Sequence, residues 1–187
     1  MISGDICDGC MNGCSLTAPG CQRGMAKARG EEFAQEPSFR DAQRLYLERQ
    51  ERIAELRKIR DCFEQAIAEH GAIYLKVFDD KEMRCKCKAV TFHMLKGDRL
   101  YFGIGVTDAF YGLLRRNTNV KFVDHPDEGR ESFCYSGKAV FHDGIEGKRL
   151  SKEALAEPGY DELKETYTME GEKRFAVFHL EQGDFKK

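Results

Sequence analysis

The stretch that decides the fold is 71–104, GAIYLKVFDDKEMRCKCKAVTFHMLKGDRLYFGI. Branched and aromatic residues occur here in short runs, which is typical of β-strands. Asp79-Asp80 and Lys96-Gly97-Asp98 interrupt these runs, and such residues favour tight turns. The stretch therefore predicts three strands joined by tight connections, at Ala72–Phe78, Met83–Met94 and Arg99–Ile104.

The same pattern continues toward the C-terminus. Three further runs, Val120–Asp124, Ser132–Phe141 and Arg174–Leu180, bring the number of expected strands to six. Six short strands with tight connections favour an antiparallel barrel. Two helical regions interrupt them, Thr107–Asn117 with Thr107 as its cap and about Ser151–Thr166. The sequence therefore predicts a mainly β domain with helices, built on an antiparallel six-stranded barrel.

A long amphipathic helix is expected before the first strand. Ser38 followed by Asp41 resembles a capping box, and Gly71 is a natural helix stop. Between them, apolar residues recur every three or four positions, which predicts a stripe that covers a sheet. A break near Gln50 is the alternative to one continuous helix. The stripe consists of Ile53, Leu56, Ile59, Phe63 and Ile67.

Four cysteines, Cys7, Cys10, Cys14 and Cys21, lie in the first 21 residues among four glycines. This segment has too few large apolar side chains to fold around a core of its own. Thiolates at such spacings can converge on one metal centre, and glycines let the backbone turn sharply around it. We therefore expect residues 1–30 to be a metal-binding segment.

Three kinds of chemistry compete for these cysteines. Disulfides require an oxidising compartment, and the N-terminus has neither the basic nor the apolar region of an export signal. Structural zinc suits Cys7 and Cys10 as a chelating pair. An iron-sulfur cluster is favoured, because the segment resembles the cluster motif of molybdopterin oxidoreductases, closed here by Cys21-Gln22-Arg23-Gly24 after a shorter gap.

Composition limits the class of protein. The 187 residues suit one domain with an appendage, and we expect 1–30 as the cysteine segment, 31–55 as linker and helix, and 56–187 as the barrel domain. With 30 basic and 32 acidic residues, no global field attracts nucleic acid. No apolar run has the length of a membrane span. We expect a soluble, cytoplasmic protein with no nucleic-acid or membrane partner.

The order of elements resembles the pyridoxamine 5′-phosphate oxidase-like FMN-binding split barrels. The resemblance covers about residues 56–187 and depends on several short strings in the family's order. These are Gly71-Ala72-Ile73-Tyr74-Leu75, Leu100-Tyr101-Phe102-Gly103, Asn117-Thr118-Asn119-Val120, Tyr135-Ser136-Gly137-Lys138-Ala139, Pro158-Gly159-Tyr160-Asp161-Glu162-Leu163 and Val177-Phe178-His179-Leu180. The resemblance implies a homodimer that holds FMN in grooves between its protomers.

The resemblance also implies where FMN phosphate would bind. One expected place is the second strand, where Arg84, Lys86 and Lys88 alternate on one face and Lys86 stands where the family usually has arginine. Cys85 and Cys87 should then lie on the other face, as packing residues.

The other expected place is the start of the following helix. After Phe102 and Gly103, Ile104 replaces the family's threonine, and Asp108 or Ala109 stands where lysine is usual. A carboxylate there repels phosphate. The remaining candidate ligands near this start are Phe102, Gly103, Thr107, Arg115 and Arg116.

Two function classes follow from these observations. The first is an FMN-dependent redox protein whose iron-sulfur cluster passes electrons to or from the flavin, with a small molecule or an electron-transfer protein as its partner. The second is a non-catalytic ligand-binding or sensing barrel with a zinc site. No catalytic residue is identified, because the sequence contains no nucleophile next to a base and no phosphate-binding loop.

Overall fold

Gly71 separates the helical part of the chain from the extended part. The computed structural model describes Met25, Arg29 and residues 39–187. Helix α2 runs without a break from Phe39 to His70, and Gly71 follows with φ +81°, its N–H donating to the Ile67 carbonyl at 2.8 Å. The predicted stop is confirmed, and no break occurs near Gln50. The expected cap, Ser38, lies outside the described residues.

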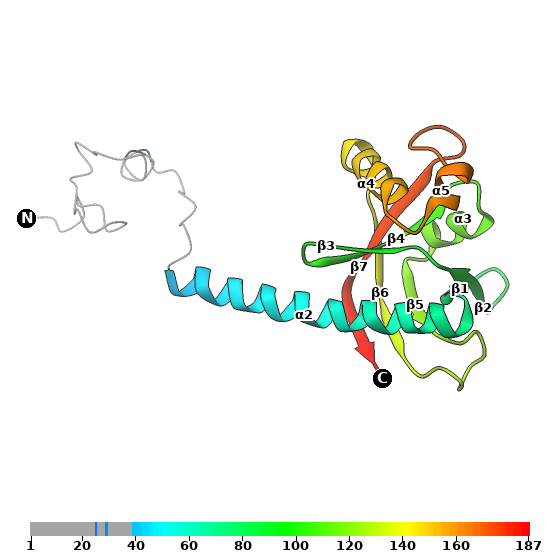
Figure 1. Ribbon diagram of the computed structural model, residues 1–187, viewed down its shortest axis with the longest axis horizontal. Coiled ribbons are helices and arrows are strands. Elements are labelled where there is room, and N and C mark those ends of the chain that lie inside the picture. Colours follow the sequence, from blue (N-terminus) through cyan, green and yellow to red (C-terminus); the bar gives the residue numbers. More distant parts are fainter. Residues whose placement is uncertain (1–24, 26–28, 30–38) are drawn as a thin grey trace, which may run out of the picture. The chain divides into compact units, whose positions relative to one another are not determined.

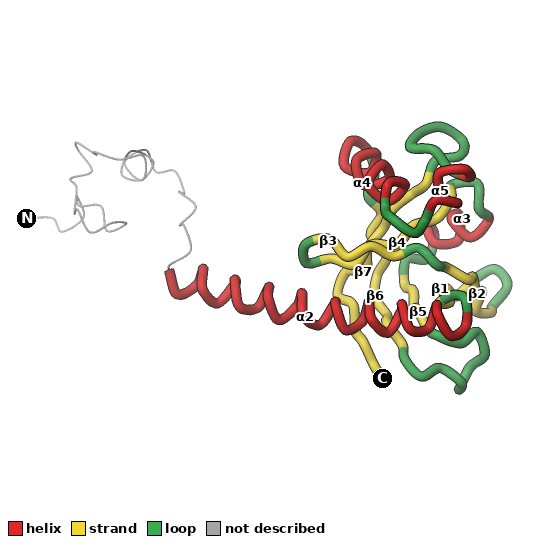
Figure 2. Tube along the Cα trace, viewed as in Figure 1, coloured by secondary structure: helices red, strands yellow, loops and turns green. Residues whose placement is uncertain are grey.

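The strands form one antiparallel sheet in the order β2-β1-β5-β6-β7-β4-β3 (Figures 1 and 2). The sheet has seven strands where six were expected. The single strand expected over 83–94 is two, because β2 pairs with β1 at one end of the strand order and β3 pairs with β4 at the other. The strands are β1 Ile73–Asp79, β2 Arg84–Val90, β3 His93–Lys96, β4 Arg99–Gly105, β5 Asn119–Val123, β6 Cys134–Phe141 and β7 Phe175–Lys186.

Three further helices connect these strands, α3 Ala109–Arg116, α4 Gly144–Ala156 and α5 Asp161–Thr166. The single helix expected over 151–166 is two, because the turn at Pro158-Gly159, with Gly159 at φ +87°, lies between α4 and α5. The predicted cap of α3 was wrong. Asp108, not Thr107, is the N-cap residue, and its carboxylate accepts a hydrogen bond from the Phe110 N–H at 2.8 Å.

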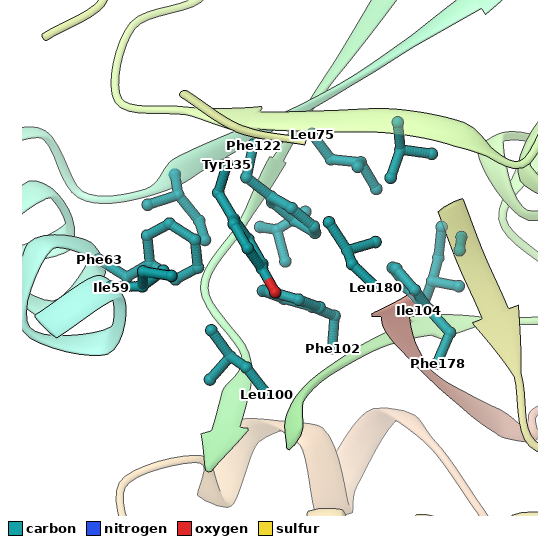
Figure 3. Close-up of a cluster of buried hydrophobic side chains, with 14 of the residues drawn as sticks. Ile59, Phe63, Leu75, Leu100, Phe102, Ile104, Phe122, Tyr135, Phe178 and Leu180 are labelled. Atoms are coloured by element: carbon teal, nitrogen blue, oxygen red, sulfur yellow. The ribbon is translucent and has the colours of Figure 1, made fainter. Parts of the chain in front are cut away.

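The main core lies between the inner face of the sheet and α2 (Figure 3). The predicted apolar stripe is buried there at Leu56, Ile59 and Phe63, and the Phe63 ring contacts aromatic rings from β3, β4, β5 and β6. Phe102 and Phe122 stack at a centroid distance of 3.9 Å near its centre. The apolar face of α2 and the apolar face of the sheet thus pack against each other in one core.

A second, smaller core covers the outer face of β4 and β7. Helix α4 supplies Leu150 and Ala154, which pack in one cluster with Tyr101 and Val177. Residues 47–187 form one compact unit. Within the described part of the chain, no helix combines the length and apolar character needed to cross a bilayer.

Candidate functional site

The second strand carries its basic residues on one face, as expected. Lys86 lies opposite Val77 and Lys88 lies opposite Leu75 on β1, so the basic row extends the core-facing side of the sheet at its β2 end. Cys85 and Cys87 lie on the other face, but both are exposed and not packed as expected. Partial burial of the Cys87 thiol raises its pKa. That thiol is therefore protonated near neutral pH and is a poor nucleophile.

One carboxylate holds the first two members of this row. Glu82 lies 2.6 Å from an Arg84 guanidinium nitrogen and 2.5 Å from Lys86 Nζ. The hydrogen bond from Lys86, followed by that from Arg84, lowers the pKa of Glu82. Because Glu82 and Arg84 are largely exposed, these pairs are screened by water and can open at little cost.

The third member of the row meets the start of α3. Lys88 Nζ forms an ion pair with one carboxylate oxygen of Asp108, while the other oxygen caps the helix at Phe110 N–H. The cap fixes the carboxylate against the basic row. The two places at which phosphate ligands were expected therefore lie next to each other, with Asp108 between them.

The charges around this junction nearly balance. Arg84, Lys86 and Lys88 supply three positive charges, and Glu82 and Asp108 return two negative ones. Within these ion pairs the net charge is one positive, while Asp79 on β1 lies opposite Arg84. The exposed end of the row is its most accessible part. A phosphate could replace Glu82 as the partner of Arg84 and Lys86, whereas Asp108 opposes its approach to Lys88.

Two expected contacts, Phe102 and Gly103, offer no side chain to a ligand. Phe102 is fully buried in the main core, and a side chain on Gly103 would overlap the Phe175 ring. Ile104, where the family has threonine, is also buried. Only backbone atoms of this segment remain for a ligand. Thr107 is exposed directly before Asp108 and stays accessible.

The two arginines on the last turn of α3 differ from each other. Arg115 binds the Asp143 carboxylate at 3.0 Å, and its guanidinium lies 5.0 Å from the Phe141 ring centroid. It is therefore engaged with the β6–α4 connection and not with the basic row. Arg116 is exposed and forms no ion pair with a described residue.

Sequence reasoning missed two buried polar pairs. Lys76 is 3% exposed and donates to Glu131 at 2.7 Å, which lowers the pKa of that carboxyl to about 2. His142 Nε2 and His179 Nδ1 lie 2.9 Å apart, because β6 and β7 pair beside them. The members of each pair lie far apart in the sequence, so no local motif could reveal them.

The predicted metal ligands Cys7, Cys10, Cys14 and Cys21 lie outside the described residues. Among the residues that the structure does describe, no cluster of histidine, cysteine or acidic side chains could hold a metal ion. The other four cysteines, Cys62, Cys85, Cys87 and Cys134, are free thiols.

No protein-family model and no curated protein matches the chain. Solved structures do match it. A NimC/NimA family protein from Clostridium acetobutylicum superposes with a TM-score of 0.51 at 17% identity, over 66% of this chain and 84% of that one. A pyridoxamine 5′-phosphate oxidase-related, FMN-binding protein from Nostoc punctiforme gives 0.45 at 13% identity, over 67% and 82%. An FMN-binding protein from Syntrophomonas wolfei gives 0.44 at 12% identity, over 78% and 93%. The chain therefore has the split-barrel fold that its sequence predicted.

Proposed function

We propose that this protein binds FMN and holds its phosphate where β2 meets the start of α3. The observation that carries the proposal is the Lys88–Asp108 ion pair, because it brings the basic row and the helix start together. FMN-binding proteins among the structural neighbours make flavin the ligand to test first. A bound flavin would supply redox chemistry that protein side chains lack.

The protein's part in this proposal is to bind and orient the phosphate. Arg84 and Lys86 donate to it after Glu82 moves aside, and Thr107 adds a hydroxyl at the edge of the site. Lys88 remains paired with Asp108 and serves as a weaker, more distant positive charge. Asp108 therefore lowers the affinity for FMN.

Two further parts of the proposal come from the sequence. Following the family resemblance, we propose a homodimer that completes the flavin groove. Following their spacing, we propose that Cys7, Cys10, Cys14 and Cys21 hold an iron-sulfur cluster that exchanges single electrons with the flavin. A small molecule or an electron-transfer protein would then be the redox partner.

One observation favours a second candidate function. Asp108 or Ala109 stands where the family's lysine would contact phosphate, and Asp108 already neutralises Lys88. A barrel of this kind would bind a ligand other than FMN, without catalysis, and zinc would replace the cluster on the four cysteines.

Substitutions at Asp108 and Lys86 decide between the two candidates. Asp108→Asn removes the charge but keeps a capping oxygen for Phe110, and Asp108→Lys reverses the charge. Both should tighten FMN binding, and Lys86→Ala should weaken it, each by roughly tenfold to a hundredfold because a charge-assisted hydrogen bond contributes about 1.5 to 3 kcal/mol. Fluorescence titration with FMN measures these shifts.

Three controls sharpen this experiment. Riboflavin lacks the phosphate, so its affinity should not respond to the substitutions, and added salt should reduce the FMN effects. Lys121→Ala changes a lysine on the opposite face of the sheet and should leave FMN binding unchanged.

The proposed homodimer is tested separately, because light scattering should then give twice the chain mass. No response to FMN in any variant would reject the flavin proposal in favour of the second candidate.

A further inference from the structure

A cavity lies apart from the basic row and differs from it in chemistry. It has a volume of about 690 Å³ and lies between the last turns of α2, the residues around β3 and the start of α5. No lysine or arginine lines it. Its lining residues are Glu64, Ile67, Ala68, Thr91, His93, Pro158, Gly159, Tyr160, Asp161, Glu162 and Leu163.

His93 lines this cavity and carries a hydrogen-bond acceptor with no partner among the described residues. Its Nδ1 lies 3.3 Å from the Thr91 carbonyl oxygen, which can only accept, so Nδ1 carries the proton. Burial lowers the pKa of His93, which keeps the ring neutral near pH 7. Its Nε2 therefore has a free lone pair, and no described residue donates a hydrogen bond to it.

Tyr160 places a hydroxyl beside this histidine. The turn at Gly159 directs the Tyr160 ring onto Phe92, with the centroids 5.0 Å apart. The hydroxyl oxygen lies 3.4 Å from His93 Nδ1 and 3.4 Å from the Thr91 carbonyl. These are long contacts, so the hydroxyl can still accept a stronger hydrogen bond from a ligand.

The charged groups around the cavity leave a negative balance. Arg60 is shared between Asp61 at 3.2 Å and Glu64 at 3.3 Å, and Lys164 pairs with Asp161 at 2.7 Å. Glu162 forms no ion pair with any residue that the structure describes. A ligand here therefore meets two neutral acceptors and an unpaired carboxylate.

We propose that this cavity binds the protonated amino group of a small organic amine. The ammonium group would donate to His93 Nε2 and the Tyr160 hydroxyl near the Glu162 carboxylate, and the organic part would pack on Ile67 and Leu163. A carboxylate or phosphate ligand would meet only acceptors and negative charge. The site thus selects the opposite charge to the basic row on β2.

The test uses benzylamine as the probe and benzoate as its anionic counterpart. Calorimetric titration of the full-length protein should detect benzylamine at millimolar concentration, with benzoate at least about tenfold weaker because like charge repels it. In NMR spectra, benzylamine should shift the Nε2 resonance of His93 and leave exposed His70 unchanged. Equal binding of the two probes, or no binding of benzylamine, would overturn the proposal.

Matched variants locate the site. Tyr160→Phe, which removes only the hydroxyl, and Glu162→Gln should each weaken benzylamine binding by about threefold to tenfold. Glu165→Gln removes the same charge from α5 at an exposed position that does not line the cavity, so affinity should stay as in wild type. Unchanged affinity in both site variants would refute the assignment. FMN titration of these variants should give the wild-type constant, which separates this site from the flavin site.

Discussion

At the scale of single residues, Asp108 combines two roles that compete in a flavin site. Its carboxylate caps α3 through Phe110 and neutralises Lys88. A lysine at this position would bind phosphate better but would remove the N-cap hydrogen bond. Such a cap typically contributes about 1 kcal/mol to stability. One carboxylate therefore stabilises the helix and, in the proposed flavin site, would lower phosphate affinity.

A second residue-scale feature is the pair of buried histidines. Burial, with the positive charge of Arg99 and the neighbouring His142, lowers the pKa of His179 from 6.5 to about 4. Glu146, 3.4 Å from His142 Nδ1, acts in the opposite direction. Folded His179 is therefore neutral at pH values where an unfolded histidine is already charged.

This difference predicts acid sensitivity. Because the folded pKa is depressed, the unfolded state takes up a proton as pH falls from 6.5 toward 4 and the folded state does not. Because of His179, the free energy of unfolding should therefore be roughly 2 kcal/mol lower at pH 5 than at pH 7. Urea denaturation at the two pH values should show this loss in wild type and a clearly smaller one in His179→Gln. His70→Gln, at an exposed position, is the control. An equal loss of unfolding free energy in all three proteins would contradict the prediction.

At the scale of elements, a glycine allows a close backbone approach at the start of α4. A side chain at Gly147 in the first turn of α4 would overlap the carbonyl oxygen of His142. Gly112 in α3 has open surroundings, with Arg116 Nη1 as the nearest atom at 3.7 Å. The two glycines look alike in the sequence, but only Gly147 is required by packing.

The two glycines therefore predict opposite effects of alanine. Gly147→Ala should lower the unfolding free energy by about 1 to 3 kcal/mol, because backbone atoms must move to admit the methyl group. Gly112→Ala should raise it by roughly 0.5 to 1 kcal/mol, since alanine is the better helix former and meets no clash. Urea denaturation of both variants measures this difference, and a neutral or stabilising Gly147→Ala would show that α4 is not held by this contact.

At the scale of the whole molecule, the two proposed sites of the split barrel have opposite charge preferences. The basic row on β2 is proposed to bind phosphate, and the cavity beside α5 is proposed to bind an ammonium group. The redox centre proposed for the cysteine segment is a third and separate proposal.

The cysteine segment can be tested without knowledge of its structure. Replacing Cys7, Cys10, Cys14 or Cys21 by serine should each time release the bound metal, because the four thiolates are proposed to share one centre. Metal and sulfide analysis after anaerobic purification measures this loss. Cys85→Ser, an exposed thiol on β2, is the control and should retain metal. Iron with equimolar sulfide identifies a cluster, zinc alone favours the second candidate function, and unchanged metal in all four variants contradicts a shared site.

The sequence by itself determined the features that depend on near neighbours. The apolar stripe of α2, the stop at Gly71 and the alternation of Lys86 and Cys87 on β2 were all predicted, because helix and strand periods are properties of short segments. The antiparallel fold followed from the turns between these segments. Candidate phosphate ligands on β2 were found for the same reason.

Only the tertiary structure decided which distant residues meet. The split of 83–94 into β2 and β3, the ion pair between Lys88 and Asp108, the pair of buried histidines and the cavity around His93 all depend on strand order. Strand order is selected by the burial of one shared core, in which Phe63 from α2 meets Phe102 and Phe122. That free energy sums over the whole domain, so no single segment of the sequence specifies the contacts that result from it.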